Sequence, residues 1–129
     1  YNYSVSENTL AVEKIYLICG RETRGASEAF ISSMKATLGE NNTIIVGETT
    51  YGEDLITQTI ASPYNFTISP AVAYVGNAEK APLFANGVDP THTINEFSDF
   101  YKIYPLGSKQ EYILYNLFYF IINGSLPQE

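Results

Sequence analysis

Two segments of the chain carry residue types that could do chemistry, residues 23–28 (TRGASE) and residues 46–53 (VGETTYGE). The first segment contributes the Ser27 hydroxyl, and the second contributes the Glu53 carboxylate. A hydroxyl becomes a nucleophile when a neighbouring base takes its proton, and a carboxylate could in principle act as that base. Nucleophilic catalysis is therefore the chemistry to weigh. The plainer interpretation of Ser27 is a first-turn hydroxyl that satisfies a backbone group of a helix.

The other reactive side chains are isolated in the sequence. Thr49 and Thr50 lie in a turn without a visible base, so capping or solvated hydroxyls are the better interpretation. His92 is the single imidazole, and we expect it to be packed or at the surface. Cys19 closes an apolar run, which favours a small buried side chain over a reactive thiol.

Metal binding has little support in the composition. One Cys and one His cannot build a zinc site. Glu48, Glu53 and Asp54 could be read as calcium ligands, but the usual alternation of oxygen ligands is absent, so a solvated acidic loop is the expected structure. We predict no metal and no cofactor.

A strand, a helix and a second strand must position the two segments. Residues 14–19 and 43–46 are continuous apolar runs that stop at a glycine, which indicates buried strands. Between them, residues 27–38 have apolar side chains at three- and four-residue spacing, which predicts a helix. A crossover helix between two strands implies a parallel sheet, so the predicted fold class is α/β. The periodic apolar positions of the helix are Ala26, Phe30, Ile31, Met34 and Leu38.

Both ends of this helix have recognisable signals. Gly25, followed three residues later by Glu28, has the layout of a capping box with glycine at the N-cap. Gly39 stands where a C-cap residue belongs. The helix is therefore expected to begin directly after Gly25.

The middle of the chain changes to shorter alternating patterns. Residues 56–60 and 66–69 alternate apolar and polar side chains across residues 62–65, which predicts a hairpin. Residues 71–75 predict another strand, and residues 91–94 alternate again.

A second helix is expected near the end of the chain. Ser108 and Glu111 have the spacing of a capping box, which predicts a helix over residues 109–122 that stops at residues 123–124. Its apolar residues run nearly all round the helix, so we expect it to be mostly buried.

Length and charge narrow the function classes. With 129 residues the chain is long enough for one domain, residues 1–129, around a single core. Its net charge of −7 and the lack of a Lys/Arg run argue against a nucleic acid partner. The longest apolar stretch, residues 113–122, is about half of what a membrane crossing needs. The chain does not begin with Met, so we expect it to be a piece of a longer protein.

The order of these motifs resembles the C-terminal processing (tail-specific) serine peptidases. That family has a Ser-Ala-Ser-Glu turn that supplies the nucleophile and a Gly-Glu-x-Thr-Tyr/Phe-Gly-Lys segment that supplies the base. Residues 45–52 are similar to the second motif, and the turn at 86–90 and the helix entry at 105–111 are similar to the distal half of the catalytic domain. The resemblance implies a crotonase/ClpP-like core, with further catalytic sequence and often a PDZ-type domain upstream.

The resemblance also implies that the catalytic dyad is degenerate. The nucleophile position is occupied by Gly25, and the lysine position is occupied by Glu53. In the family the backbone N–H after the nucleophile, here that of Ala26, helps to hold an oxyanion, so a peptide C-terminal carboxylate could still dock there. An ordinary hydrated helix start is an equally good interpretation. We also hypothesise that Arg24 and Glu53 form a structural ion pair at the old catalytic position.

Three functional interpretations follow. The first is a catalytically silent peptidase-like domain that retains peptide binding, with a peptide or an unfolded protein C-terminus as its partner. The second is an active serine peptidase that uses Ser27 or residues outside this chain. The third is a structural or oligomer-forming domain, suggested by the Tyr/Phe-rich final helix. The resemblance implies an extracytoplasmic location, periplasmic or at the bacterial cell surface.

Overall fold

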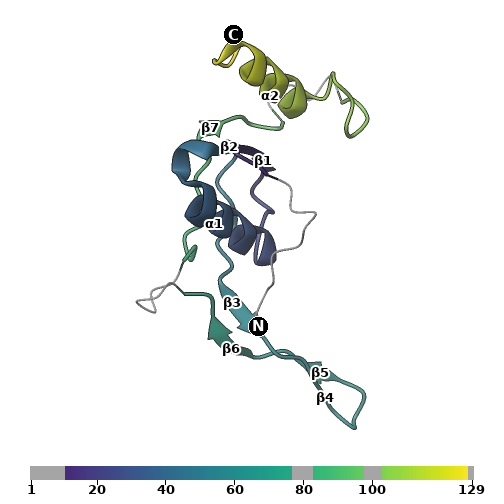
Figure 1. Cartoon of the computed structure of the whole chain (residues 1–129). Helices are drawn as coiled ribbons and strands as arrows, with labels where there is room; N and C mark the ends of the chain where they lie inside the picture. The colour runs from purple at the N-terminus through teal and green to yellow at the C-terminus, as the bar shows by residue number, and fades with distance from the viewer. Residues whose placement is uncertain (1–10, 77–82, 98–102, 128–129) are drawn as a thin grey trace.

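A three-stranded parallel sheet forms the centre of the molecule. The computed structural model describes residues 11–76, 83–97 and 103–127. The sheet has the order β1 (Ile15–Cys19), β2 (Thr43–Gly47) and β7 (His92–Thr93), and both pairings are parallel (Figure 1). The predicted α/β fold class and the predicted parallel pair are therefore confirmed.

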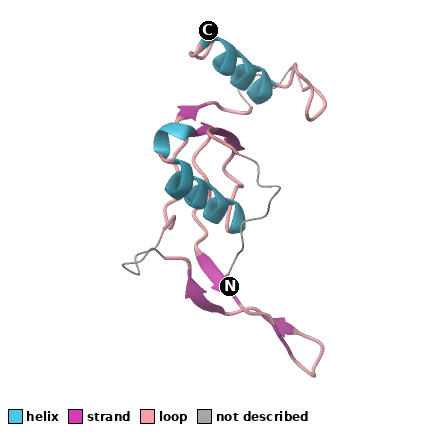
Figure 2. Cartoon of the chain, viewed as in Figure 1, coloured by secondary structure: helices cyan, strands magenta, loops and turns pink. Residues whose placement is uncertain are grey.

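Helix α1 (Ala26–Leu38) connects β1 to β2 and covers one face of the sheet (Figure 2). A short 3-10 helix, η1 (Glu40–Asn42), follows α1. Successive residues of a strand point to opposite faces, so Ile45 contacts the α1 side while its neighbours pack under α2 (Tyr112–Asn123). The α1-side cluster contains Cys19, Ile31, Ile45, Phe84 and Val88, and the α2-side cluster contains Ile44, Val46, Ile94, Ile113 and Leu117.

A two-stranded antiparallel ribbon, residues 55–74, extends away from these layers (Figure 1). Strand β3 (Leu55–Thr57) pairs with β6 (Ala71–Tyr74), and further out β4 (Ile60–Ala61) pairs with β5 (Thr67–Ile68). The hairpin predicted from alternation is present, and the strand predicted at residues 71–75 is its continuation. Every residue of these four strands is exposed.

The two helices depart from prediction in how much they bury. Helix α1 begins at Ala26 and ends at the Gly39 cap, as predicted, but Phe30 on the predicted core face is 48% exposed. Helix α2 begins at Tyr112 with Glu111 as its N-cap, so the predicted capping box at Ser108 is wrong. The Glu111 carboxylate accepts hydrogen bonds from the amides of Ile113 and Leu114.

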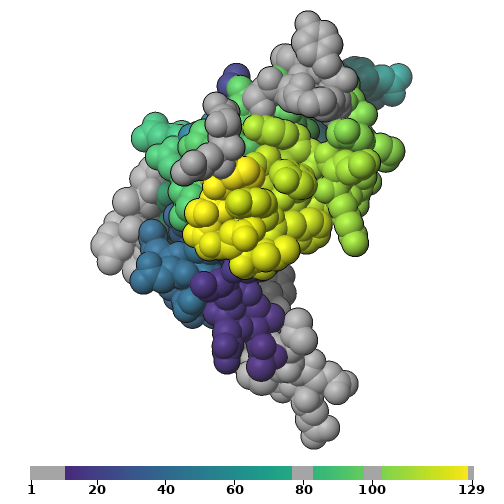
Figure 3. All heavy atoms as spheres, turned by 90° about the horizontal axis from the view of Figure 1, so that it is seen from above, coloured from purple at the N-terminus to yellow at the C-terminus, as the bar shows by residue number. Residues whose placement is uncertain are grey.

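The outer face of α2 is open, contrary to the prediction of a mostly buried helix. Only Ile113, Asn116 and Leu117 of this helix are buried. In Figure 3 the yellow-green α2 faces the viewer as an open surface. An apolar pattern that runs all round a helix does not by itself say what covers each side. The exposed members are Tyr115, Phe118, Tyr119, Ile121 and Ile122.

Candidate active site

The turn between β1 and α1 places Gly25 directly beside Glu53. Gly25 has φ 58° and ψ −116°, a conformation that L side chains rarely adopt. A Cβ atom built on Gly25 would lie 3.9 Å from Oε2 of Glu53. The two positions that the resemblance assigned to nucleophile and base therefore lie side by side.

Glu28 fixes the relative positions of these two residues. Its carboxylate is fully buried, at 0% exposure, and accepts four hydrogen bonds. Oε2 accepts from the Gly25 amide at 3.0 Å and from the Glu53 amide at 2.8 Å. Oε1 accepts from the Thr50 hydroxyl at 2.5 Å and from the Gly52 amide at 2.7 Å. The capping box predicted at Gly25 is confirmed, and the same carboxylate also holds the loop after β2.

This network keeps Glu28 ionised. Burial by itself raises the pKa of the Glu28 carboxyl, but the bonds from the Thr50 hydroxyl and from the amides of Glu53, Gly52 and Gly25 outweigh it. The pKa of Glu28 therefore lies below its usual value. Thr50 is a buried link in the network rather than the solvated or capping hydroxyl that we expected, since its oxygen also accepts from the Val88 amide at 2.7 Å.

The predicted ion pair between Arg24 and Glu53 does not form. The Arg24 guanidinium pairs with Glu22 and lies over the Tyr51 ring, 4.3 Å from its centroid. Within the described part of the chain, the Glu53 carboxylate has no hydrogen-bond or ion-pair partner. The turn directs Arg24 to a carboxylate only two residues away, which leaves Glu53 free beside Gly25.

Ser27 and Ala26 lie at the exposed start of α1. The Ser27 amide donates to the Arg24 carbonyl at 3.2 Å, and its hydroxyl has no hydrogen-bonded base among the described residues. The Ala26 amide likewise has no hydrogen-bond acceptor in the described ranges. The structure thus brings an unpaired backbone N–H next to Gly25, and it gives Ser27 no partner that would activate it.

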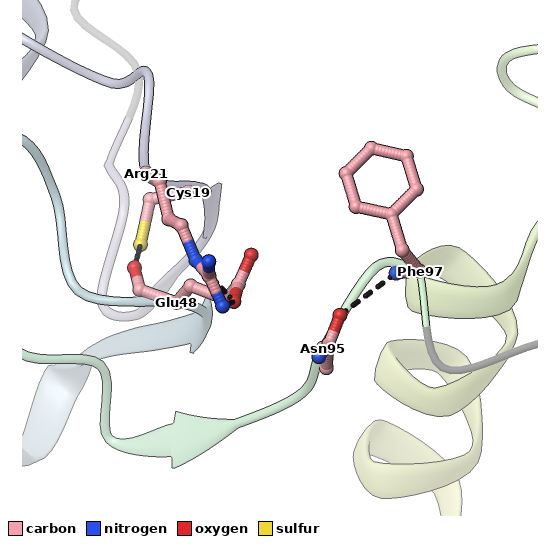
Figure 4. A network of polar contacts seen from close by, with 5 residues as sticks. All are labelled: Cys19, Arg21, Glu48, Asn95 and Phe97. Carbon is pink, nitrogen blue, oxygen red and sulfur yellow. Dashed lines mark hydrogen bonds and ion pairs between the residues drawn. The ribbon is translucent and has the colours of Figure 1, made fainter.

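A cleft of about 710 Å³ lies at the carboxyl ends of β1, β2 and β7. In parallel sheets, this end is where ligands bind. In Figure 4, Arg21 and Glu48 stand on one side, with Asn95 and Phe97 on the other. Arg21 donates to one Glu48 oxygen through Nε at 2.8 Å and Nη2 at 2.7 Å. The lining residues are Gly20, Arg21, Glu22, Thr23, Glu48, Asn95, Glu96 and Phe97.

The cleft is lined by the residues that precede Gly25 in the turn between β1 and α1. Its lining residues 20–23 form a tight turn in which the Thr23 amide donates to the Gly20 carbonyl at 2.9 Å. The Tyr51 amide donates to the Thr23 carbonyl, also at 2.9 Å. The β1–α1 turn that lines the cleft is therefore joined by a backbone hydrogen bond to the loop after β2.

The remaining candidates occupy structural positions. Cys19 is buried, and its thiol donates to the Glu48 carbonyl at 3.1 Å. Burial, together with the nearby Glu48 charge, raises the pKa of Cys19 to about 11, although the hydrogen bond to the Glu48 carbonyl opposes this shift. His92 packs against the Phe120 ring with 4.3 Å between centroids. The acidic loop is not uniformly solvated, because Asp54 is buried and its Oδ2 has no hydrogen-bond partner.

The comparisons with known proteins agree on the fold. An S41 protease from Bacteroides fragilis superimposes with a TM-score of 0.73 and 29% sequence identity over 87% of this chain. The photosystem II D1 C-terminal processing protease superimposes with a TM-score of 0.50 and 22% identity over 64% of this chain. The likeness to the S41 protease supports the family resemblance seen in the motifs, and the likeness to the D1 processing protease shows the fold alone. The chain spans 28% of the S41 protease and 20% of the D1 processing protease. No protein-family model and no curated protein matches the chain.

Two features are absent from the described residues. No helix there is long and apolar enough to cross a membrane. Within the same ranges, no group of three or more His, Cys, Asp or Glu side chains could hold a metal ion.

Glu28 is the site residue whose importance the sequence did not reveal. Its spacing from Gly25 predicted only a capping residue. Three of its four hydrogen-bond donors come from residues 50–53, more than twenty positions away. A Glu at the third position of a capping box, followed later by a second Gly-rich turn, is the signal that could have suggested it.

Proposed function

We propose that this chain is a peptidase-like domain that does not cleave peptides and that binds an extended polypeptide. The observation that carries the proposal is the position of Gly25 next to Glu53: a residue without a side chain lies beside a carboxylate that has no partner among the described residues. Fold similarity to S41 and C-terminal processing proteases supports a peptidase-like domain. The chain spans less than a third of either neighbour. We interpret it as the distal part of such a catalytic domain.

The chemistry of the two positions argues against peptide cleavage. Gly25 offers no nucleophilic atom. The Glu53 carboxylate carries the opposite charge to a lysine, and its nearest oxygen faces the place where a side chain at Gly25 would begin. Serine-type acyl transfer needs a hydroxyl and a proton acceptor within hydrogen-bond reach of each other, and Gly25 supplies no hydroxyl.

Binding is supported by the unpaired Ala26 amide and by the cleft at the strand ends. A free C-terminal carboxylate at Ala26 would lie close to the Glu53 anion, and like charges repel. A neutral backbone carbonyl avoids that repulsion and can still accept from the amide. We therefore expect the bound polypeptide to place an internal carbonyl at Ala26 rather than its C-terminus.

A titration and a labelling experiment test the two halves of the proposal separately. A fluorescent peptide with an amidated C-terminus is titrated with the native chain, followed by the same peptide with a free carboxylate. We expect the amidated peptide to bind more tightly and Glu53→Gln to reduce the difference. Absence of binding by both peptides would overturn the binding half.

Covalent labelling tests whether the site lacks a reactive serine. A serine-directed fluorophosphonate should leave the native chain unlabelled, because Gly25 has no hydroxyl and Ser27 has no base. Labelling that disappears in Ser27→Ala would overturn the proposal and identify Ser27 as the nucleophile. The variant Gly25→Ser/Glu53→Lys restores the dyad, and Gly25→Ala/Glu53→Lys is its matched control, with the same backbone strain and no hydroxyl.

The proposal includes an extracytoplasmic location, which follows from the family resemblance. Fractionation of the producing cells checks it: we expect the protein outside the cytoplasmic fraction. Recovery with cytoplasmic markers would contradict this part alone and would leave the peptide-binding proposal unaffected.

A further inference from the structure

The ribbon of residues 55–74 is an exposed surface without charge. No Asp, Glu, Lys, Arg or His occurs from Leu55 to Gly76, although the chain as a whole has a net charge of −7. Leu55, Ile60 and Ile68 are more than half exposed, at 56%, 54% and 54%. A two-stranded ribbon is marginally stable in water without a third strand or a packing partner. Its sequence therefore favours contact with another polypeptide.

One edge of the ribbon is better suited to that contact than the other. Residues 55–61 (LITQTIA) contain no charge, no Pro and no Gly, which is the composition of segments that pair edge to edge. The opposite strand is interrupted by Pro70, and prolines protect strand edges from pairing. The register with the opposite strand shifts between Ile56 and Thr57, whereas Thr57, Ile60 and Ala61 keep one register with Ala71, Ile68 and Thr67, so the open edge of constant register is residues 57–61.

The hydrogen bonds inside the ribbon show which amides face outward. The Gln58 amide donates to the Pro70 carbonyl at 3.1 Å, and the Ser62 amide donates to the Phe66 carbonyl at 2.9 Å. Because alternate residues of a strand direct their amides to opposite sides, Thr59 and Ala61 direct theirs away from the partner strand. Among the described strands, none pairs with this outer edge.

We propose that residues 57–61 pair antiparallel with the same residues of a second copy of this chain. A twofold axis makes such an edge complementary to itself, and two ribbons then form one four-stranded sheet. Two chains of charge −7 repel each other, and contact through the ribbon brings no charged side chains together. The interface is small, which predicts a weak, concentration-dependent dimer. This inference uses the open edge of the ribbon and does not use the site at Gly25 and Glu53.

Sedimentation velocity of the 129-residue chain over a range of concentrations tests the dimer. We expect the sedimentation coefficient to rise with concentration for the native chain. Gln58→Glu places two like charges at the edge and should keep the chain monomeric. Gln110→Glu, at an exposed site outside the ribbon, changes the net charge equally and should leave the dimer unchanged. Equal loss in both variants would mean that net charge alone controls association, and would overturn the proposal.

A backbone variant tests edge pairing without adding charge. Thr59→Pro removes an outward amide and also the Thr59 hydroxyl, which lies 3.0 Å from the Ser69 hydroxyl. Ser69→Ala removes the same hydroxyl pair and leaves the edge amide intact, so it is the matched control. We expect Thr59→Pro to abolish the dimer and Ser69→Ala to retain it, with circular dichroism showing that both remain folded. A monomeric native chain at all concentrations, or a dimer that survives Thr59→Pro, overturns the proposal.

Discussion

The Thr50 hydroxyl donates a 2.5 Å hydrogen bond to the Glu28 carboxylate and accepts a 2.7 Å bond from the Val88 amide. These two hydrogen bonds connect the first turn of α1, the loop after β2 and the turn that leads into β7. The Thr50 amide also donates to the Val88 carbonyl at 3.1 Å, so the two residues bind each other twice. The geometry at Gly25 and Glu53 is therefore set by a buried side chain that belongs to neither.

Replacing Glu28 with Gln should destabilise the domain by about 3 kcal/mol. The amide has one acceptor oxygen where the carboxylate has two, so its nitrogen would face buried N–H or O–H donors. Urea unfolding followed by fluorescence gives the free energy. Glu40→Gln, at a side chain that is 82% exposed, is the control and should change stability by less than about 0.5 kcal/mol.

A double-mutant cycle with Thr50→Val isolates the Glu28–Thr50 bond. Because both residues belong to one buried network, the effects of Glu28→Gln and Thr50→Val should not add. Additive losses would contradict the coupling that the 2.5 Å contact implies.

The pH dependence of stability should carry the signature of Glu28. Its pKa is lowered from 4.5 in the folded state, so the stabilisation is fully present above pH 4.5 and is lost as the pH falls through the folded pKa. Free energies of unfolding are measured from about pH 7 to about pH 3. We expect the difference between the native chain and Glu28→Gln to shrink below pH 4.5. A difference that stays constant across this range would show that Glu28 is not the group responsible.

Gly47, at the end of β2, is predicted to be hard to replace. A Cβ at this position would lie 1.9 Å from the Cys19 carbonyl oxygen, and φ is 127°. Gly39 has φ 84° and nothing within 4 Å of its Cβ position, so Gly39→Ala measures the backbone strain alone, about 1 kcal/mol. Gly47→Ala should cost at least about 3 kcal/mol more or prevent folding. Similar thermal unfolding midpoints for the two variants would show that β1 can move aside.

The central unit could be predicted from sequence because its signals are local. The apolar runs at residues 14–19 and 43–46, with the Gly25 and Gly39 caps between them, each depend on neighbours within one turn or one strand. These patterns correspond to β1, α1 and β2 within one residue at each end. The family resemblance placed Gly25 beside Glu53, which periodicity alone could not do.

The rest depended on the tertiary structure. Arg24 was predicted to pair with Glu53 at the old catalytic position, but in the structure it pairs with Glu22, two residues away. The burial of α2 was overestimated because its pattern does not distinguish a covered face from an open one. The prediction that Phe30 is buried was wrong for the same reason. Helical spacing predicts which residues share a face, but only the tertiary structure decides whether that face is covered.

Cys19 should be nearly inert to thiol reagents in the folded protein. Its pKa is raised from 9.0 to about 11, chiefly by burial, so the thiolate fraction at pH 8 falls about 100-fold, and only 3% of the residue is accessible. The reaction with an aromatic disulfide reagent at pH 8 is followed by absorbance, with the chain in 8 M urea as the control. We expect the folded rate to be at least about 100-fold lower and to rise with urea in parallel with unfolding. A folded rate close to the unfolded one would mean that the end of β1 opens readily, and with it the turn that holds Gly25 against Glu53.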